Sequence, residues 1–225
     1  NEVFAPAPNQ HTARMLAAMT CMMHLHRQAW DIKLAYCWAD LPEGQLIALK
    51  YPKGYERSRE VHDGNVIRHE PEYIVLRKNC YGLPAAGKTW ADHRDAYMMS
   101  HFNPEDGSMT CTRAQYDPCL FYITRGPRIR QDDECDNTLR PYHEEAWVSI
   151  HTDDCDGYAT SKQLLEYIYS QHNKKWKAKA VDPNYLLGIA KKEKIVKSTD
   201  GTITQHTMEL MMKTFVDGMV EAHEA

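Results

Sequence analysis

The sequence predicts an α+β fold in which an antiparallel sheet packs against helices. The expected strands occur mostly in adjacent pairs rather than alternating with helices, which favours an antiparallel sheet over a doubly wound one. The chain has 225 residues, of which 43% are hydrophobic, so it can bury a sizeable core. This length and near-average composition exclude a disordered chain and a small protein held together by disulfides.

The first half of the chain is expected to form two helices and three strands. Asn9 is a suitable N-cap for a helix that runs to about Arg27 and is rich in Ala and Met nearly all round, as a buried helix would be. A short buried strand, 29–33, follows and carries Asp31. Runs of β-branched and aromatic residues predict two further strands, and apolar residues at helical spacing predict the second helix. These three segments are 46–51, 73–78 and 90–102.

The second half is expected to add strands, a helix and a hairpin. Ser161 is a suitable N-cap for a helix that ends near His172, and Asp200-Gly201 is a good turn pair for a hairpin. The expected strands are 119–124, 147–152, 158–160, 185–196 and 202–206, and a last amphipathic helix covers 208–221. Two polar stretches, 56–71 and 125–145, are expected to be loop insertions.

Charge and cysteine spacing limit the class of protein. The formal net charge is −4, which argues against nucleic-acid binding through bulk charge. Eight lysines nevertheless lie between 174 and 197 with only Asp182 and Glu193 among them, so either a strip that holds a phosphate backbone or a solvated lysine-rich hairpin is expected there. The seven cysteines show no zinc or redox spacing, and no secretory signal or membrane span is visible, which favours an intracellular protein.

The most informative feature is a pair of adjacent carboxylates, Asp153 and Asp154, directly after an expected strand. Successive side chains on a strand point to opposite faces, so these two can share one site only where the backbone turns. Like charges this close are costly unless a cation neutralises them, and a solvated turn is the simpler alternative. Asp31 ends another apolar strand, so three carboxylates converge if the two strands are neighbours. Such a cluster would hold two Mg²⁺ ions about 3.5 to 4 Å apart.

Seven segments, in order along most of the chain, carry a family resemblance. They are Phe4-Ala-Pro6, Trp30-Asp-Ile-Lys-Leu-Ala-Tyr36, 40–55 with its Tyr-Pro-Lys-Gly-Tyr, 76–90 with its Tyr-Gly-Leu, Asp117-Pro-Cys-Leu120, His151-Thr-Asp-Asp154 and Tyr185-Leu-Leu-Gly-Ile189. Together they resemble the reverse transcriptase domain of copia-type LTR retrotransposons. Any one segment is weakly specific, whereas seven in the family's order are a strong match.

The resemblance implies a polymerase palm with part of the fingers, as a fragment of a larger Pol polyprotein. Upstream fingers strands and downstream thumb, RNase H and integrase segments are then expected in cis, outside this chain. The implied activity is RNA-directed DNA polymerase, with an RNA template, a DNA primer-template duplex and a dNTP as partners, and no membrane. Two Mg²⁺ ions are the implied cofactors, with Mn²⁺ as a substitute. The implied location is the cytoplasm, in a virus-like particle, with a nuclear phase also allowed.

The resemblance implies a catalytic role for four positions. Asp31, Asp153 and Asp154 would bind the metal ions, with the Ile32 carbonyl as a further ligand. Lys179 would protonate the leaving pyrophosphate, with Lys177 as the rival for this role.

The resemblance also implies contacts with the nucleotide and the primer. Leu34 and Ala35 would present backbone amides to the triphosphate, and Tyr36 would stack under the deoxyribose and exclude a 2′-hydroxyl. The remaining implied contacts are Tyr81 and Gly82 near the nucleotide, and Leu187, Gly188 and Ile189 at the primer end.

Two alternatives to a polymerase stay open. His151 and Thr152 replace the family's Tyr and Val beside the aspartates, and 84–87 lacks its polar residues. The first alternative is a non-catalytic remnant that keeps the fold and binds nucleic acid or a protein, which the missing flanks favour. The second is a different two-metal nuclease or a nucleotidyl cyclase. A metal site at His24 and His26 is not expected, because residues two apart do not share a helix face.

Overall fold

A six-stranded antiparallel sheet forms the centre of the computed structural model, which describes residues 6–50, 61–62, 65–66, 73–126, 143–186 and 189–212. The strand order is β10-β1-β9-β8-β7-β6, and every neighbouring pair is antiparallel. The bounds are β1 His26–Asp31, β6 Met109–Arg113, β7 Leu120–Arg125, β8 Glu144–His151, β9 Asp154–Ala159 and β10 Lys179–Val181. The predicted α+β class with an antiparallel sheet is therefore confirmed.

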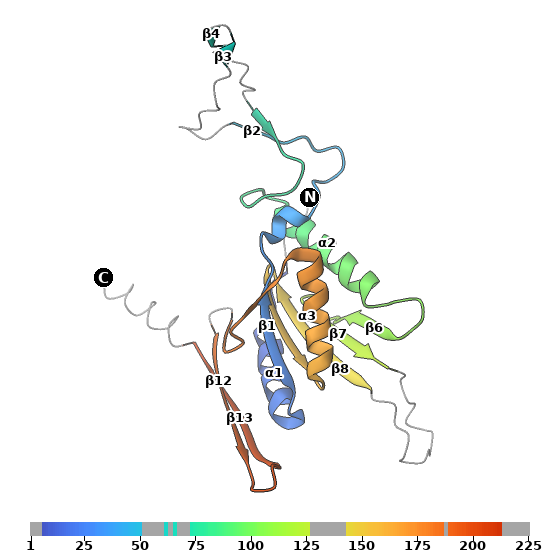
Figure 1. The fold of residues 1–225 in the computed structure, drawn as a ribbon, viewed down its shortest axis with the longest axis vertical. Helices are drawn as coiled ribbons and strands as arrows, with labels where there is room; N and C mark the ends of the chain where they lie inside the picture. The colour runs from blue at the N-terminus through green and yellow to red at the C-terminus, as the bar shows by residue number, and fades with distance from the viewer. Residues whose placement is uncertain are drawn as a thin grey trace, which may run out of the picture.

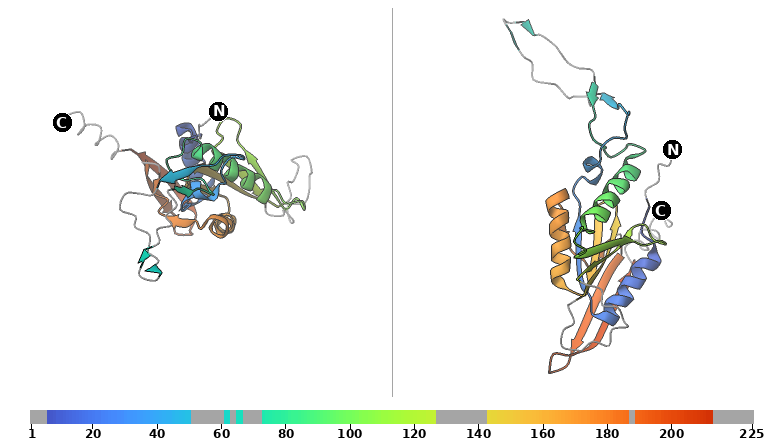
Figure 2. Two further views of the ribbon diagram at one scale, coloured as in Figure 1. Left: turned by 90° about the horizontal axis from the view of Figure 1, so that it is seen from above. Right: turned by 90° about the vertical axis from the view of Figure 1, so that its right-hand side faces the viewer.

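Helices cover both faces of this sheet (Figures 1 and 2). Helices α2 (Ala86–His101) and α3 (Lys162–Trp176) lie on one face, and α1 (Gln10–Met23) lies on the other. The predicted N-caps are confirmed, since the Asn9 side chain accepts from the His11 amide and the Ser161 side chain accepts from the Leu164 amide. Because both faces are covered, the central strands alternate between two separate apolar clusters.

The larger cluster, between the sheet and α2 and α3, is rich in aromatic rings. Trp30 of β1 is fully buried, and its indole Nε1 donates to Nδ1 of the buried His172 on α3 at 2.9 Å. Burial lowers the pKa of His172 to about 3, so this imidazole is neutral and can accept that bond. Trp90 and Trp176 pack edge to face beside this pair, which joins the two helices.

A hairpin of β12 (Ile189–Lys197) and β13 (Ile203–Met211) extends from the sheet, with β11 (Tyr185–Leu186) on its edge. Its loop contains Gly201 at φ +87°, a conformation that glycine adopts without steric cost. The predicted hairpin is thus confirmed, with the expected strand 185–196 divided into β11 and β12. On its inner side, the buried Lys191 forms an ion pair with Asp156 of β9 and donates to the Tyr158 hydroxyl at 3.0 Å.

Two expected helix bounds are wrong because strand pairing replaces helical structure. Two others are too short, since α2 begins at Ala86 rather than Trp90 and α3 ends at Trp176 rather than near His172. The first helix ends at Met23 rather than near Arg27, since His24 is left-handed and Arg27 already pairs with Tyr158 in the sheet. The last helix does not begin at Met208, because β13 runs to Met211 opposite β12. The rest of that expected helix, from 213, lies outside the described residues.

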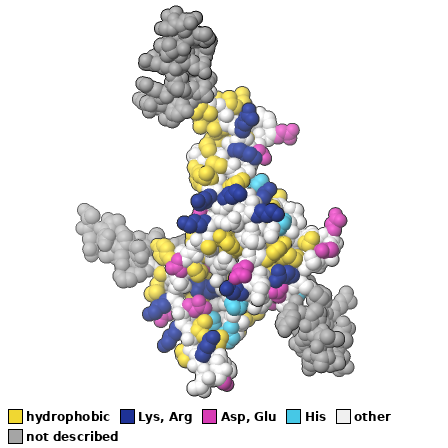
Figure 3. Space-filling model, in the orientation of Figure 1, with side chains coloured by type: hydrophobic (Ala, Val, Ile, Leu, Met, Phe, Trp, Pro, Cys, Tyr) yellow, Lys and Arg dark blue, Asp and Glu magenta, His cyan; other side chains and the backbone are white. Residues whose placement is uncertain are grey.

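A narrow arm leaves the sheet between η1, a 3₁₀ helix over Ala35–Trp38, and α2 (Figure 1). It holds the pair β2 (Ala48–Lys50) and β5 (Tyr73–Val75), where two strands were expected, and the short pair β3 (Val61–His62) and β4 (Asn65–Val66) within the expected insertion 56–71. Figure 3 shows hydrophobic side chains gathered on this arm. The exposed hydrophobic residues of the arm are Leu46, Leu49, Tyr73, Ile74 and Val75.

The second expected insertion, 125–145, is shorter than its predicted range. Arg125 belongs to β7 and pairs with Glu144 of β8, so both strands continue into the range. Positions 127–142 lie outside the described residues. The short elements β6, β10 and η1, each of five residues or fewer, were not expected from the sequence. In the described part of the chain, no helix is both long and apolar enough to cross a membrane.

We expect the substitution Gly157→Ala to destabilise the fold through a clash with Trp30. An added Cβ would lie 2.8 and 2.9 Å from two indole carbons of Trp30 and 3.0 Å from Leu165. The cost should be about 1–3 kcal/mol, as for other overpacked cores, measured by denaturant unfolding. Trp30→Phe removes those ring carbons, so the double variant should lose less stability than the two single losses combined. If the losses of unfolding free energy in the two single variants simply add in the double variant, the result would contradict the clash.

Candidate active site at one end of the central sheet

Four polar side chains form a row across four neighbouring strands. Asp31 of β1 pairs with Asp154 of β9, Asp154 pairs with His151 of β8, and Asp31 pairs with Lys179 of β10. Cross-strand partners project from the same face with Cβ atoms about 4.5–5.5 Å apart. Trp30 and Cys155 next to them point into the core on the other face. The sheet therefore brings Asp31 and Asp154 together although 122 positions separate them in the sequence.

Asp153 joins this row from the turn between β8 and β9. Thr152 and Asp153 are the only residues between the paired His151 and Asp154, so the connection is a two-residue hairpin turn. Thr152 has φ +52°, which is unfavourable for a β-branched residue. The Asp153 carbonyl accepts from the Ile32 amide at 2.8 Å. This bond fixes the turn against the end of β1 and places Asp153 beside Asp31.

Burial and neighbouring charge raise the pKa of two of the three carboxyl groups. Burial, then the charges of Asp153 and Asp31, raise the pKa of Asp154, and the nearby His151 opposes the shift. Burial and Asp153 likewise raise the pKa of Asp31, opposed by Lys33 and Lys179. The site thus concentrates more negative charge than its neighbours neutralise, which is the electrostatic condition that favours a bound cation.

The donor set has the right chemistry for Mg²⁺, which binds through oxygen ligands. Among the residues that the structure describes, however, no three His, Cys, Asp or Glu side chains are gathered closely enough to hold one metal ion. Mutual repulsion gives a physical reason, since unneutralised carboxylates lower their energy by turning apart. Binding would therefore require Asp31, Asp153 and Asp154 to rotate toward a shared ion.

Two tyrosines lie next to the carboxylates. The chain turns at Leu34, which is left-handed and exposed, and enters η1. Tyr36 on η1 packs against Tyr81, with ring centroids 4.5 Å apart, and burial and the Asp153 charge raise the pKa of Tyr81.

The other predicted site residues differ in how near they lie. Gly82 follows Tyr81 at φ +94°, a backbone conformation that glycine adopts without steric cost. Lys179 faces Asp31 in the strand register, whereas Lys177 is the C-cap of α3, so the geometry favours Lys179. Ile189 pairs with Leu186 in the sheet of β11 to β13, which is a different sheet from that of the carboxylates. Leu187 and Gly188 lie outside the described residues.

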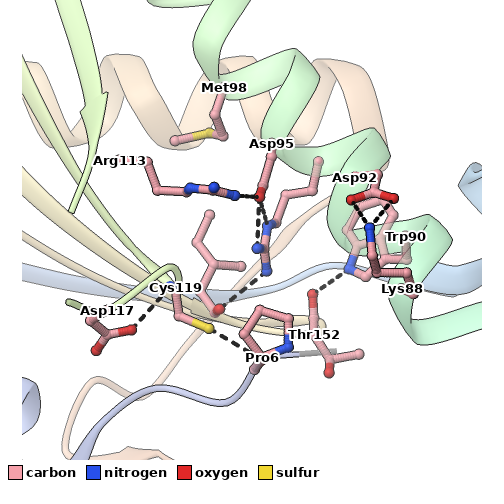
Figure 4. A network of polar contacts seen from close by, with 12 residues as sticks. Pro6, Lys88, Trp90, Asp92, Asp95, Met98, Arg113, Asp117, Cys119 and Thr152 are labelled. Atoms are coloured by element: carbon pink, nitrogen blue, oxygen red, sulfur yellow. Dashed lines mark hydrogen bonds and ion pairs between the residues drawn. The ribbon is translucent and has the colours of Figure 1, made fainter. Parts of the chain in front are cut away.

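Two side chains of α2 bind the backbone that leads into the turn carrying Asp153. Trp90 Nε1 donates to the Thr152 carbonyl at 2.6 Å (Figure 4). Arg94 Nη1 donates to the Ile150 carbonyl at 3.2 Å. From the sequence, Trp90 was expected only as a helical and motif residue, and Arg94 was not singled out. Their spacing of four positions on one helix face was visible, but the carbonyls they reach depend on tertiary packing.

The lysine-rich segment does not form one outward strip. Lys191 points inward to Asp156. Lys192 and Lys194 lie on the opposite face of β12, because successive side chains of a strand point to opposite faces. Lys174 and Lys175 lie in the last turn of α3, where positive charge interacts favourably with the helix dipole. Around the hairpin in Figure 3, basic side chains are interspersed with acidic ones. Structural roles therefore account for part of this positive charge.

Comparisons with known proteins identify no relative, since no family model, no curated protein and no solved structure matches the chain significantly. The geometry at the end of the sheet is therefore the basis for the functional proposal.

We expect Asp154→Asn to stabilise the fold near neutral pH in the absence of divalent cations. The pKa of Asp154 is higher in the folded than in the unfolded protein, so the wild type loses stability as the pH rises through the folded-state pKa. The difference in unfolding free energy between the variant and the wild type should therefore narrow as the pH falls toward the pKa of Asp154 in the unfolded chain. Denaturant unfolding at several pH values measures this.

Asp106→Asn is the matched control for that experiment. Hydrogen bonds from Ser108 lower the pKa of the exposed Asp106, so this variant should change stability in the opposite direction. An Asp154→Asn variant that is less stable than wild type would contradict the repulsion at the site.

Proposed function

We propose that this chain is a palm domain, with part of the fingers, of an RNA-directed DNA polymerase. One observation carries the proposal: Asp31 and Asp154 are cross-strand neighbours, with Asp153 in the adjoining turn. The electrostatic coupling of all three carboxylates supports the same assignment. The ordered motif resemblance to copia-type reverse transcriptases supplies the reaction class, which geometry alone leaves open.

The reaction would join a primer 3′-hydroxyl to the α-phosphate of a dNTP and release pyrophosphate. Asp31, Asp153 and Asp154, with the Ile32 carbonyl, would hold two Mg²⁺ ions, or Mn²⁺ in their place. When bound, such ions activate the attacking hydroxyl and stabilise the charge on the leaving group. The protein's own contribution is then to hold its ligands and both substrates in line.

The groups around the carboxylates suit the parts of a nucleotide. Leu34 is exposed at the turn before η1, where its amide can face a triphosphate. Tyr36, packed on Tyr81, would lie under the sugar and exclude a 2′-hydroxyl by its bulk. Lys179, opposite Asp31, would donate a proton to pyrophosphate. Leu187, Gly188 and Ile189 would contact the primer end.

The partners in this proposal are an RNA template, a DNA primer-template duplex and a dNTP. The chain would work as part of a Pol polyprotein that also contains RNase H and integrase. Its location would be intracellular, in a cytoplasmic virus-like particle with access to the nucleus. A non-catalytic palm that only binds nucleic acid or protein is the second candidate, and the ungathered carboxylates favour it.

We expect Asp153→Asn to abolish primer extension on an RNA template with dNTPs and Mg²⁺. Loss of a metal ligand should reduce the extension rate at least about 100-fold, because changing a residue that only supports a ligand already reduces activity by up to about that much. The experiment compares three proteins: the chain extended upstream to include the fingers, the same extended protein with Asp153→Asn, and the present chain. Equal unfolding midpoints would show that folding is intact. Full activity in the variant would contradict the assigned site, and cleavage of nucleic acid without dNTPs would indicate a nuclease.

We expect Tyr36→Ala to admit ribonucleotides. Removing the ring leaves room for a 2′-hydroxyl, so the ratio of kcat/KM for dNTP over rNTP should fall while extension with dNTPs persists. Tyr81→Phe is the control, because it keeps the ring that packs against Tyr36 and removes only the hydroxyl. Unchanged sugar selectivity in Tyr36→Ala would contradict the role of this residue.

A further inference from the structure

We propose that Trp90 and Arg94 of α2 are positioning residues that hold the backbone of the Thr152–Asp153 turn beside the end of β1, so that Asp153 stays within reach of a cation shared with Asp31 and Asp154. The effect on cation binding rests on the proposed function, whereas the effect on the turn does not. Trp90 and Arg94 contact backbone carbonyls, so each would work through the backbone that leads into the turn.

Both side chains reach the same segment from the same side of α2. They are four positions apart, so they project from one face of the helix, and each is only 1% exposed. Trp90 binds the Thr152 carbonyl at 2.6 Å, and Arg94 binds the Ile150 carbonyl at 3.2 Å, two residues earlier on β8. Figure 4 shows Trp90 beside Thr152. The two bonds thus fix the last residues of β8 and the first residue of the turn.

Thr152 is the position where such support is needed. Its φ of +52° places a β-branched residue in the left-handed region, an unfavourable conformation that the surroundings must offset. The carbonyl that Trp90 binds belongs to the peptide plane linking Thr152 to Asp153. Fixing this plane fixes the direction in which the chain enters Asp153.

Arg94 is itself held in place, so the support is rigid. Asp95 accepts from Nε and Nη2 of Arg94 at 2.8 and 2.7 Å, and it also accepts from Arg113 of β6. The Asp95 carboxylate therefore balances the buried guanidinium of Arg94. A buried arginine needs such a partner, and the remaining Nη1 group is left to bind the Ile150 carbonyl.

Trp176 of α3 provides a matched control. It is fully buried and contacts Trp90 edge to face, with ring centroids 5.2 Å apart. In the described structure its buried Nε1 has no hydrogen-bond partner. Trp90→Phe and Trp176→Phe thus remove the same atoms from the same cluster, but only Trp90→Phe removes a hydrogen bond to the turn.

The first test records backbone amide NMR shifts of the wild type and both variants without metal. Trp90→Phe should shift the amides of Thr152, Asp153, Asp154 and Ile32, whose N–H binds the Asp153 carbonyl. Trp176→Phe should shift mainly amides of α2 and α3. Equal shifts of the turn amides in the two variants would overturn the proposal.

The second test measures Mn²⁺ binding by electron paramagnetic resonance. Trp90→Phe should weaken binding about tenfold, as for residues that support metal ligands, while Trp176→Phe should stay within about twofold of wild type. Arg94→Lys keeps the charge beside Asp95 but loses the planar fork, so it should also weaken binding and serves if Trp90→Phe does not fold. Equal affinities in all folded variants would overturn the cation part of the inference.

The two tests separate this inference from the proposed function. If Asp153→Asn binds Mn²⁺ as well as wild type does, the metal site of the proposed function is wrong. The amide shifts then still decide whether Trp90 and Arg94 position the turn.

Discussion

The pairing of β1 with β9 is the constraint on which the rest of the structure depends. It places a strand from the beginning of the chain between β9 and β10, in a sheet whose other members all lie at or after Met109. On one face, Trp30 packs over Gly157, and the absence of a side chain at that glycine permits the close contact. On the other face, the same register sets Asp31 opposite Asp154. One set of backbone hydrogen bonds therefore aligns both the core and the site.

The site opposes the stability that the sheet supplies. Burial and neighbouring carboxylate charges raise the pKa of Asp31 and of Asp154 at the sheet end, and Thr152 adds an unfavourable backbone conformation. Such features persist only where the surroundings outweigh them. Here the surroundings are the aromatic cluster between α2 and α3 and the two side chains of α2 that bind the turn. Stability in the core is thus what allows strain and repulsion at the site.

A second polar network attaches the β12–β13 hairpin to the face of the sheet that lies away from α2 and α3. Lys191 and Asp156 are both buried, and Arg27 of β1 pairs with Glu193 of β12 at 3.0 Å. Breaking one partner of a buried pair leaves an uncompensated charge, so these pairs specify how the hairpin docks more than they add stability. The same network uses two charged residues of a segment that the sequence presents as a solvated basic run.

Local chemistry in the sequence was enough to predict much of this protein. Asn9 and Ser161 cap their helices because their side chains accept from nearby amides, and the Asp200-Gly201 turn forms because both residues suit it. Adjacent strand pairs predicted the antiparallel sheet, and Asp31, Asp153 and Asp154 were expected to converge if their strands were neighbours. Only the tertiary structure decided that they are neighbours, that β13 continues where a helix was expected, and that Lys191 points inward. The physical reason is that capping and turns depend on residues a few positions apart, whereas register, burial and the grip of Trp90 and Arg94 on the turn depend on partners tens of positions away.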